Sequence, residues 1–179
     1  GHLVAVDALE RIARLRPEDA QPLVSSGRLL LQLKDAEGAM QVAEEALVRD
    51  SSNHEVWQLK GRVELAQGQL AGAIESFSKA LEVQPDHAYA LNNLGFAYLQ
   101  ANMNEEAVKT LGRAAELLPA VAYVQNNLGV ALERTGRMDQ ARVAYDLATS
   151  LSPKYVKAQL NSKRLAKLVI EGEEATEEP

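Results

Sequence analysis

The sequence predicts an all-α protein built from antiparallel helix pairs, and two observations carry this prediction. One is an internal repeat with a period of 34 residues. The other is that each repeat contains two segments with apolar residues at helical spacing, separated by a residue that ends a helix. Such a chain is expected to form an array in which each helix pair packs against its neighbours.

Small residues show the period most clearly. Glycine recurs in one register and alanine in two others: Gly27, Gly61, Gly95 and Gly129; Ala39, Ala73, Ala107 and Ala141; and Ala46, Ala80, Ala114 and Ala148. Two looser registers hold Pro17, Ser51, Pro85, Pro119 and Pro153, and Ala43, Phe77, Leu111 and Tyr145. Together they define four whole repeats, which are 20–53, 54–87, 88–121 and 122–155.

Each repeat is expected to contain two helices. In the third repeat the apolar positions of the two predicted helices are Leu91, Leu94, Gly95 and Tyr98, and Ala107, Leu111, Ala114 and Leu118. Asn102 lies between them, at the position of Gly68 and Gly136, and such a residue tolerates the left-handed conformation that ends a helix. Prolines at the repeat boundaries then stop the second helix.

The tetrapeptide Asn-Asn-Leu-Gly occurs twice, at 92–95 and 126–129. Glycine costs about 1 kcal/mol relative to alanine within a helix, so its recurrence indicates a close helix crossing that returns at least as much. We therefore predict that Gly95 and Gly129 are structural. For Asn92 and Asn126, packing against a neighbouring helix and contact with a ligand both remain open.

The second repeat resembles the tetratricopeptide repeat (TPR) pattern at Trp57, Gly61, Gly68, Ala73, Phe77, Ala80 and Pro85. The resemblance covers residues 20–155 and implies a right-handed α-solenoid, with four full repeats, an N-terminal half repeat and a C-terminal capping helix. Ser51, Ala43 and Lys60 depart from the pattern, and we expect weaker packing at that end.

The flanking segments extend this register. Residues 1–19 are interpreted as a tag scar, Gly1-His2, followed by the second helix of a truncated repeat. Residues 156–170 have the register of a first helix and are predicted to form a polar cap. Residues 171–179 hold five glutamates and no basic residue, which predicts an acidic disordered tail.

On a helical wheel, one strip of each first helix faces away from the predicted core. In the third repeat it holds Tyr89, Asn93 and Phe96, and the resemblance implies that this side is a concave groove for a peptide or partner protein. Tyr89 and Tyr123, its equivalent in the fourth repeat, could instead pack between repeats. The full predicted site is Tyr89, Asn93, Phe96, Tyr123, Asn127, Val130, Arg62, Arg134, Lys157, Asn161 and Arg164.

The chemistry of this strip suits protein recognition. An asparagine amide offers both a donor and an acceptor to the backbone of an extended chain, and Asn93, Asn127 and Asn161 form a ladder in register. Basic residues, including Arg28 and Arg62, flank the aromatic middle, which favours a ligand with an apolar centre and acidic groups near an end. The set of cations and amides that clamps a terminal carboxylate in some family members is incomplete here.

Composition argues against several other classes. The net charge is −6, which disfavours nucleic-acid binding, and no apolar run is long enough for direct membrane insertion. Cysteine is absent, and His2, His54 and His87 show no spacing typical of a metal site or a catalytic triad. We therefore expect no enzyme activity, no metal and no cofactor. The compartment remains open between cytoplasm and periplasm.

Three functions are compatible with this reading. The first is an adaptor that binds a peptide or partner protein in the groove. The second is a substrate-positioning arm of a larger enzyme, such as an O-linked glycosyltransferase. The third is a self-assembling scaffold, in which the open N-terminal face or the acidic tail contacts a second copy.

Overall fold

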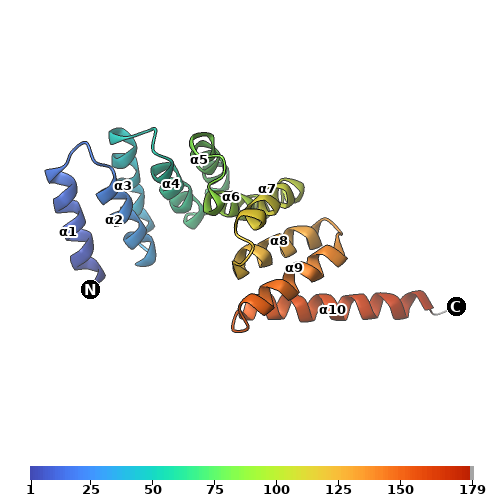
Figure 1. Ribbon diagram of the computed structural model, residues 1–179. Coiled ribbons are helices and arrows are strands. Elements are labelled where there is room, and N and C mark those ends of the chain that lie inside the picture. The colour runs from blue at the N-terminus through green and yellow to red at the C-terminus, as the bar shows by residue number, and fades with distance from the viewer. Residues whose placement is uncertain (178–179) are drawn as a thin grey trace. The chain divides into compact units, whose positions relative to one another are not determined.

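The computed structural model describes the backbone of residues 1–177 and the side chains of residues 1–168. Within that range the chain forms ten α-helices and no strand (Figure 1). They are α1 (His2–Leu15), α2 (Gln21–Gln32), α3 (Ala36–Arg49), α4 (His54–Ala66), α5 (Leu70–Val83), α6 (Ala88–Gln100), α7 (Asn104–Leu117), α8 (Ala122–Arg134), α9 (Met138–Leu151) and α10 (Val156–Glu177). The predicted all-α array of helix pairs is confirmed.

Each of the four predicted repeats contains one helix pair. We call α2, α4, α6 and α8 the first helices and α3, α5, α7 and α9 the second helices. The remaining two are α1, in the register of a second helix, and α10, in that of a first helix. The α10 helix continues to Glu177, beyond the predicted end at Ile170. Most of the expected acidic tail is thus helical, in keeping with the helix propensity of Glu and Ala, while residues 178–179 lie outside the described residues.

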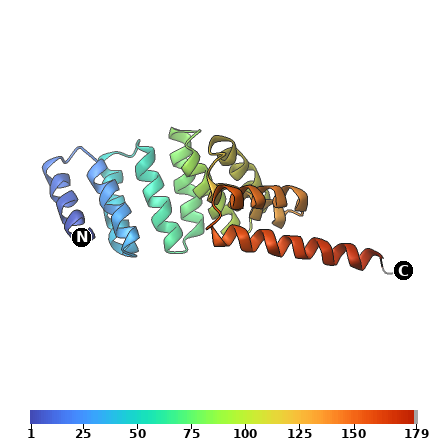
Figure 2. The same cartoon turned by 60° about the horizontal axis from the view of Figure 1, so that its bottom comes forward.

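The chain divides into two compact units, residues 1–97 and 98–179. In the N-terminal unit α2 packs against α1, α3 and α4, and α4 packs against α3 and α5. Figures 1 and 2 show these helices side by side in chain order. In the C-terminal unit α8 packs against α7, α9 and α10, and α9 packs against α10.

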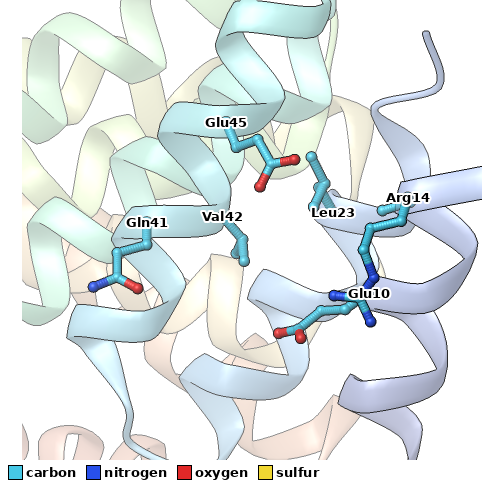
Figure 3. Close-up of a pocket in the computed structure, with 7 residues that line it drawn as sticks. Glu10, Arg14, Leu23, Gln41, Val42 and Glu45 are labelled. Atoms are coloured by element: carbon cyan, nitrogen blue, oxygen red, sulfur yellow. The ribbon is translucent and has the colours of Figure 1, made fainter. Parts of the chain in front are cut away.

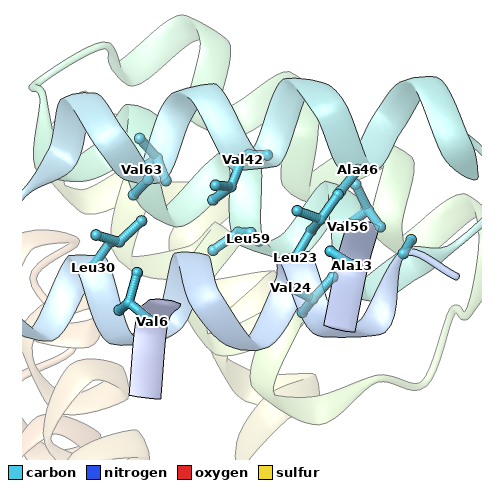
Figure 4. Packing of buried hydrophobic residues seen from close by; sticks show 13 residues of the cluster. Val6, Ala13, Leu23, Val24, Leu30, Val42, Ala46, Val56, Leu59 and Val63 are labelled. Atoms are coloured by element: carbon cyan, nitrogen blue, oxygen red, sulfur yellow. The ribbon is translucent and has the colours of Figure 1, made fainter. Parts of the chain in front are cut away.

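A large apolar cluster of the N-terminal unit runs from α1 to α4 (Figure 4). Its central members, Val24, Val56 and Val63, have no exposed surface. In the C-terminal unit, Leu111 and Tyr145 are fully buried in two smaller clusters. Apolar burial of this kind supplies the main driving force for helix pairing, at about 25 cal/mol per Å² of apolar surface.

The glycine register marks close contacts with bulky side chains. A Cβ added at Gly61 would lie 2.7 Å from the Phe77 ring, and one at Gly129 would lie 2.6 Å from the Tyr145 ring. Both distances are too short for real atoms, so an aromatic side chain fits only because the facing residue is glycine. In the first repeat, where Ala43 replaces the aromatic residue, Leu59 of the next repeat lies against Gly27 instead.

The turns within the repeats use a left-handed residue in one register. Gly68, Asn102 and Gly136 have φ angles of 74°, 58° and 78°, as predicted. Lys34 occupies the same position in the first repeat with a φ of 64°. A residue other than Gly or Asn is unfavourable in this conformation, because its Cβ atom approaches the following carbonyl oxygen.

Side-chain donors tie successive repeats together in another register. The Trp57 Nε1–H group donates to the carbonyl of Ser51 at 2.7 Å, and the Gln125 amide donates to that of Pro119 at 3.1 Å. Gln159 donates to Pro153 in the same way. Each donor lies on a first helix and each acceptor lies in the loop before it, so the loop is fixed at the proline register.

Candidate functional site

The candidate site is the side of the first helices that faces away from the core, and we call it the first-helix face. The predicted site residues lie in both compact units, and the face is described separately in each. In the N-terminal unit Tyr89 is 51% exposed, whereas Asn93 and Phe96 are half-buried. All three are carried by α6, whose inner side is buried through Leu91 and Leu94, as the helical wheel predicted. Their side chains thus offer an aromatic surface and an amide.

In the C-terminal unit, α8 carries the matching residues. Tyr123 is 39% exposed and Asn127 is half-buried. Val130 is partly buried and packs against both apolar clusters of this unit, so it supports the core as well as the face. The accessible part of this surface is therefore provided mainly by Tyr123 and Asn127.

The first asparagine of each Asn-Asn-Leu-Gly segment is buried. Asn92 is 6% exposed and Asn126 is 4% exposed. The Asn126 Oδ1 atom accepts a hydrogen bond at 2.9 Å from Nδ2 of Asn161 on α10. Of the two alternatives for Asn126, ligand contact and packing against a neighbouring helix, the structure shows packing against the next helix in the register of the first helices. The same bond engages the amide of Asn161, which the sequence placed in the ligand-binding ladder.

Arg164, predicted to contact a ligand, is engaged within the chain. Its guanidinium binds both carboxylate oxygens of Glu133 on α8, and the contact of Nη2 with Oε2 is 2.7 Å long. The Tyr145 hydroxyl donates to Oε2 of the same carboxylate at 2.7 Å. The Arg164 hydrogen bond is the main reason why the pKa of Glu133 is lowered, while burial raises the pKa of Tyr145. Sequence reasoning did not select Glu133 or Tyr145 as partners of this arginine.

Of two other cations in the predicted site, Arg134 is hydrogen-bonded within the chain and Lys157 is exposed. The Arg134 guanidinium donates to the carbonyl of Leu99 at 2.6 Å, which caps the end of α6. It also borders an open hollow of about 610 Å³, together with Met103 and Glu105. Lys157 is exposed and has no ion pair within the residues whose side chains are described.

Arg62 on α4 is half-buried, and within residues 1–168 it makes neither a hydrogen bond nor an ion pair. Burial, followed by the positive charge of Arg28, lowers the pKa of Arg62. Arg28 itself donates to Oε1 of Glu55 at 3.2 Å, and Gln21 binds the other oxygen of that carboxylate. The Glu55 carboxylate, which pairs with Arg28, is therefore already shared by two partners.

Two of the three histidines of the N-terminal unit, His54 and His87, form a small cluster at the starts of α4 and α6. The rings of His54 and His87 are 5.0 Å apart between centroids. The Nδ1 atom of His87 accepts from the backbone N–H of Ala90 at 3.1 Å, and burial lowers the pKa of His87. Histidine here caps a helix. Among the described side chains, no three His, Asp or Glu residues converge in a way that could hold a metal ion.

A cavity of about 240 Å³ lies between α1, α2 and α3 (Figure 3). Its apolar floor includes Leu23 and Val42, and its rim carries Glu10, Arg14 and Glu45. The rim belongs to α1 and α3, which have the register of second helices, so the cavity is separate from the first-helix face. Sequence reasoning did not predict it.

None of the described helices combines the length and apolar character that crossing a membrane requires.

Antiparallel helix pairs of fixed period, with a glycine packed against a bulky side chain and a left-handed turn residue, define a helical repeat protein. The chain belongs to the tetratricopeptide repeat family. The sequence model of the tetratricopeptide repeat matches residues 3–54 and 97–156, and a second model, of the TPR repeat, matches residues 61–102.

Curated relatives resemble only part of the chain. Tetratricopeptide repeat protein 33 of Mus musculus is 33% identical over 81 residues, which are 45% of this chain and 31% of that protein. The BBSome complex member BBS4 of Bos taurus is 28% identical over 107 residues, which are 59% of this chain and 20% of that protein. The chain thus spans less than a third of the length of these relatives.

Solved structures match most of the chain. YrrB, described as a TPR protein with an unusual peptide-binding site, has a TM-score of 0.76 at 23% identity, covering 91% of this chain and 84% of its own. The Cut9-Hcn1 hetero-tetramer structure has a TM-score of 0.84 at 22% identity, covering 92% and 33%. At these identities the likeness establishes the fold alone.

Proposed function

We propose that this protein is a non-catalytic scaffold or adaptor that binds a peptide or a segment of another protein on its first-helix face. The observation that carries the proposal is the recurrence of an exposed tyrosine and a half-buried asparagine in register. Tyr89 and Asn93 are the pair in the N-terminal unit, and Tyr123 and Asn127 are the pair in the C-terminal unit.

The side-chain chemistry supports binding of an extended segment. An asparagine amide can pair with the backbone N–H and C=O groups of a bound chain whatever its sequence, and a tyrosine adds apolar contact with little loss of side-chain entropy. Peptide binding by YrrB, which has the same fold, is consistent with this role. The alternatives of an enzyme arm and a self-assembling scaffold gain no specific support from the described residues and stay predictions.

A peptide selection tests the proposal. Short peptides are selected from a random display library on the wild-type chain, and their affinities are measured by fluorescence anisotropy. The double variant Asn93→Ala/Phe96→Ala is expected to weaken binding about tenfold or more, because it removes one amide contact and one aromatic contact.

The matched control removes exposed side chains from a second helix. Gln41→Ala/Val48→Ala changes two exposed residues of α3 and is expected to leave the affinity unchanged. Circular dichroism checks that both variants remain helical. Selected peptides that bind the folded Asn93→Ala/Phe96→Ala variant as tightly as the wild type would show that this face is not the site.

A further inference from the structure

Arg62 and Arg164 occupy the same position of a first helix, three repeats apart, but among the side chains of residues 1–168 only Arg164 has an acid partner. Arg164 binds both oxygens of Glu133, which comes from the preceding first helix. Tyr145 completes this arrangement by donating a hydrogen bond to the same carboxylate. The chain itself therefore shows which ligand an arginine in this register binds.

At the equivalent positions three repeats earlier, the acid and the phenol are both missing. Leu31 takes the place of Glu133, and Ala43 takes the place of Tyr145. Within residues 1–168 Arg62 makes no ion pair with a carboxylate, and the charge that acts on it is a second cation, Arg28. The carboxylate of Glu55 is occupied by Arg28 and Gln21.

A half-buried guanidinium without a partner is unfavourable, because it has lost part of its hydration and gained no counter-charge. An external carboxylate would supply that charge. Its attraction would be stronger than at a fully exposed site, because the effective dielectric constant is lower near buried atoms. The planar guanidinium also matches a carboxylate in bidentate geometry, as the Arg164 pair demonstrates.

We infer that Arg62 binds a Glu or Asp carboxylate supplied by a partner protein, in the place that Glu133 occupies beside Arg164. The inference rests on the proposed function, because Arg62 shares the register of Phe96 and lies in the same compact unit as Tyr89 and Asn93. The partner segment is accordingly acidic. Since the whole chain carries a net charge of −6, this preference arises locally and not from the overall charge.

The probe for this site is a fluorescein-labelled peptide in which glutamate alternates with leucine, and its counterpart has glutamine in place of glutamate. Affinities are measured by anisotropy at physiological ionic strength, so that general charge effects are screened. The wild-type chain is expected to bind the glutamate peptide about tenfold more tightly than the glutamine peptide, as for one hydrogen-bonded charge pair.

Two variants should abolish this preference by different routes. Arg62→Gln removes the cation, and Leu31→Glu keeps the cation but supplies an internal carboxylate that competes with the peptide. Leu31→Gln, the uncharged control, is expected to retain the preference, because it loses the leucine without supplying an acid. Arg142→Gln makes the same charge change on α9, beside Asp139, and should also retain it.

The inference is overturned if the glutamate preference persists in Arg62→Gln or Leu31→Glu, or if the two control variants lose it equally. It is also overturned if the wild-type chain binds neither peptide or binds both equally. The proposed function is judged separately, by the selected peptides and the Asn93→Ala/Phe96→Ala variant. Peptides without acids that lose affinity only for that variant would leave the proposed function standing and refute the carboxylate site.

Discussion

The second and fourth repeats each have a glutamate near the end of the first helix, but the two glutamates differ by one position in the repeat. This shift sends the two carboxylates to different sides of the helix. The second repeat has Glu64-Leu65 where the fourth has Leu132-Glu133. One residue corresponds to about 100° of rotation around a helix. Glu64 therefore lies inside its helix pair, 4% exposed, whereas Glu133 reaches the following first helix and binds Arg164.

The inward glutamate makes a polar contact within the core. Its carboxylate binds the Lys60 ammonium at 2.6 Å and accepts from the Ser76 hydroxyl at 2.6 Å. Gly72 leaves room for it, because a Cβ there would lie 2.9 Å from the Glu64 carboxylate. The comparison teaches that a shift of one position decides whether a glutamate can pair with an arginine of the next first helix. The fourth repeat supplies an acid to the first-helix face, and the second repeat keeps its acid inside the helix pair.

The largest expected effect comes from breaking the inward contact. Glu64→Ala leaves Lys60 and the buried Ser76 hydroxyl without their acceptor, so the free energy of unfolding should fall by about 3 kcal/mol. Urea denaturation monitored by circular dichroism measures the change. The double variant Lys60→Leu/Glu64→Leu copies Leu128 and Leu132 of the fourth repeat and should recover most of the loss. Equal losses in both variants would contradict the account.

The next effect tests whether the glycine register is steric. Gly129→Ala forces a Cβ against the Tyr145 ring and should lower the free energy of unfolding by about 2 kcal/mol. Gly112 on α7 is the matched control, since a Cβ there meets nothing within 4 Å. Gly112→Ala should raise stability by up to about 1 kcal/mol through helix propensity. If thermal unfolding showed that both substitutions change stability in the same direction, the close-approach argument would fail.

A smaller effect is expected at the turns. Both compared repeats have glycine at the left-handed position, Gly68 and Gly136, whereas the first repeat has Lys34. Lys34→Gly should raise the free energy of unfolding by about 1 kcal/mol, and Gly68→Lys should lower it by a similar amount. Urea denaturation should show that the two substitutions change the free energy of unfolding in opposite directions. A destabilised Lys34→Gly variant would refute the explanation.

The smallest effect concerns the outward glutamate. Because the folded-state pKa of Glu133 is lowered from 4.5, its pairing stabilises the protein above that pH and is lost as the pH falls through the lowered pKa. Glu133→Gln should cost about 0.5 kcal/mol at neutral pH, since Arg164 is half-exposed. The difference from the wild type should vanish in acid. A difference that stays constant from neutral to acidic pH would be evidence against the pairing.

Much of the fold could be predicted from the sequence, because each helix pair depends on residues that repeat at a fixed interval. The close approach at Gly129 and the left-handed turn at Asn102 follow from the period and the residue types alone. Lys34 was missed because lysine carries no turn signal of its own, although its register with Gly68 would have revealed it.

The candidate site was harder to predict, because its partners come from neighbouring repeats. A helical wheel placed Arg62 and Arg164 on the same side but could not show that Arg164 binds Glu133. Similarly, Asn161 has the register of a ligand contact, yet its amide binds Asn126 of the preceding helix. The signal that could have separated these cases is the residue on the preceding first helix, 31 positions before Arg164 and 35 positions before Asn161.

The most direct test of the difference between the two arginines is NMR spectroscopy of the side-chain Nε–H groups in a ¹⁵N-labelled chain. Arg62→Lys and Arg164→Lys variants assign the two signals, and the glutamate-leucine peptide is then titrated in. The account predicts that the Arg62 signal shifts and saturates with the affinity measured by anisotropy, while the Arg164 signal stays in place. An Arg62 signal that does not move at saturating peptide, or an Arg164 signal that moves as far, would contradict it.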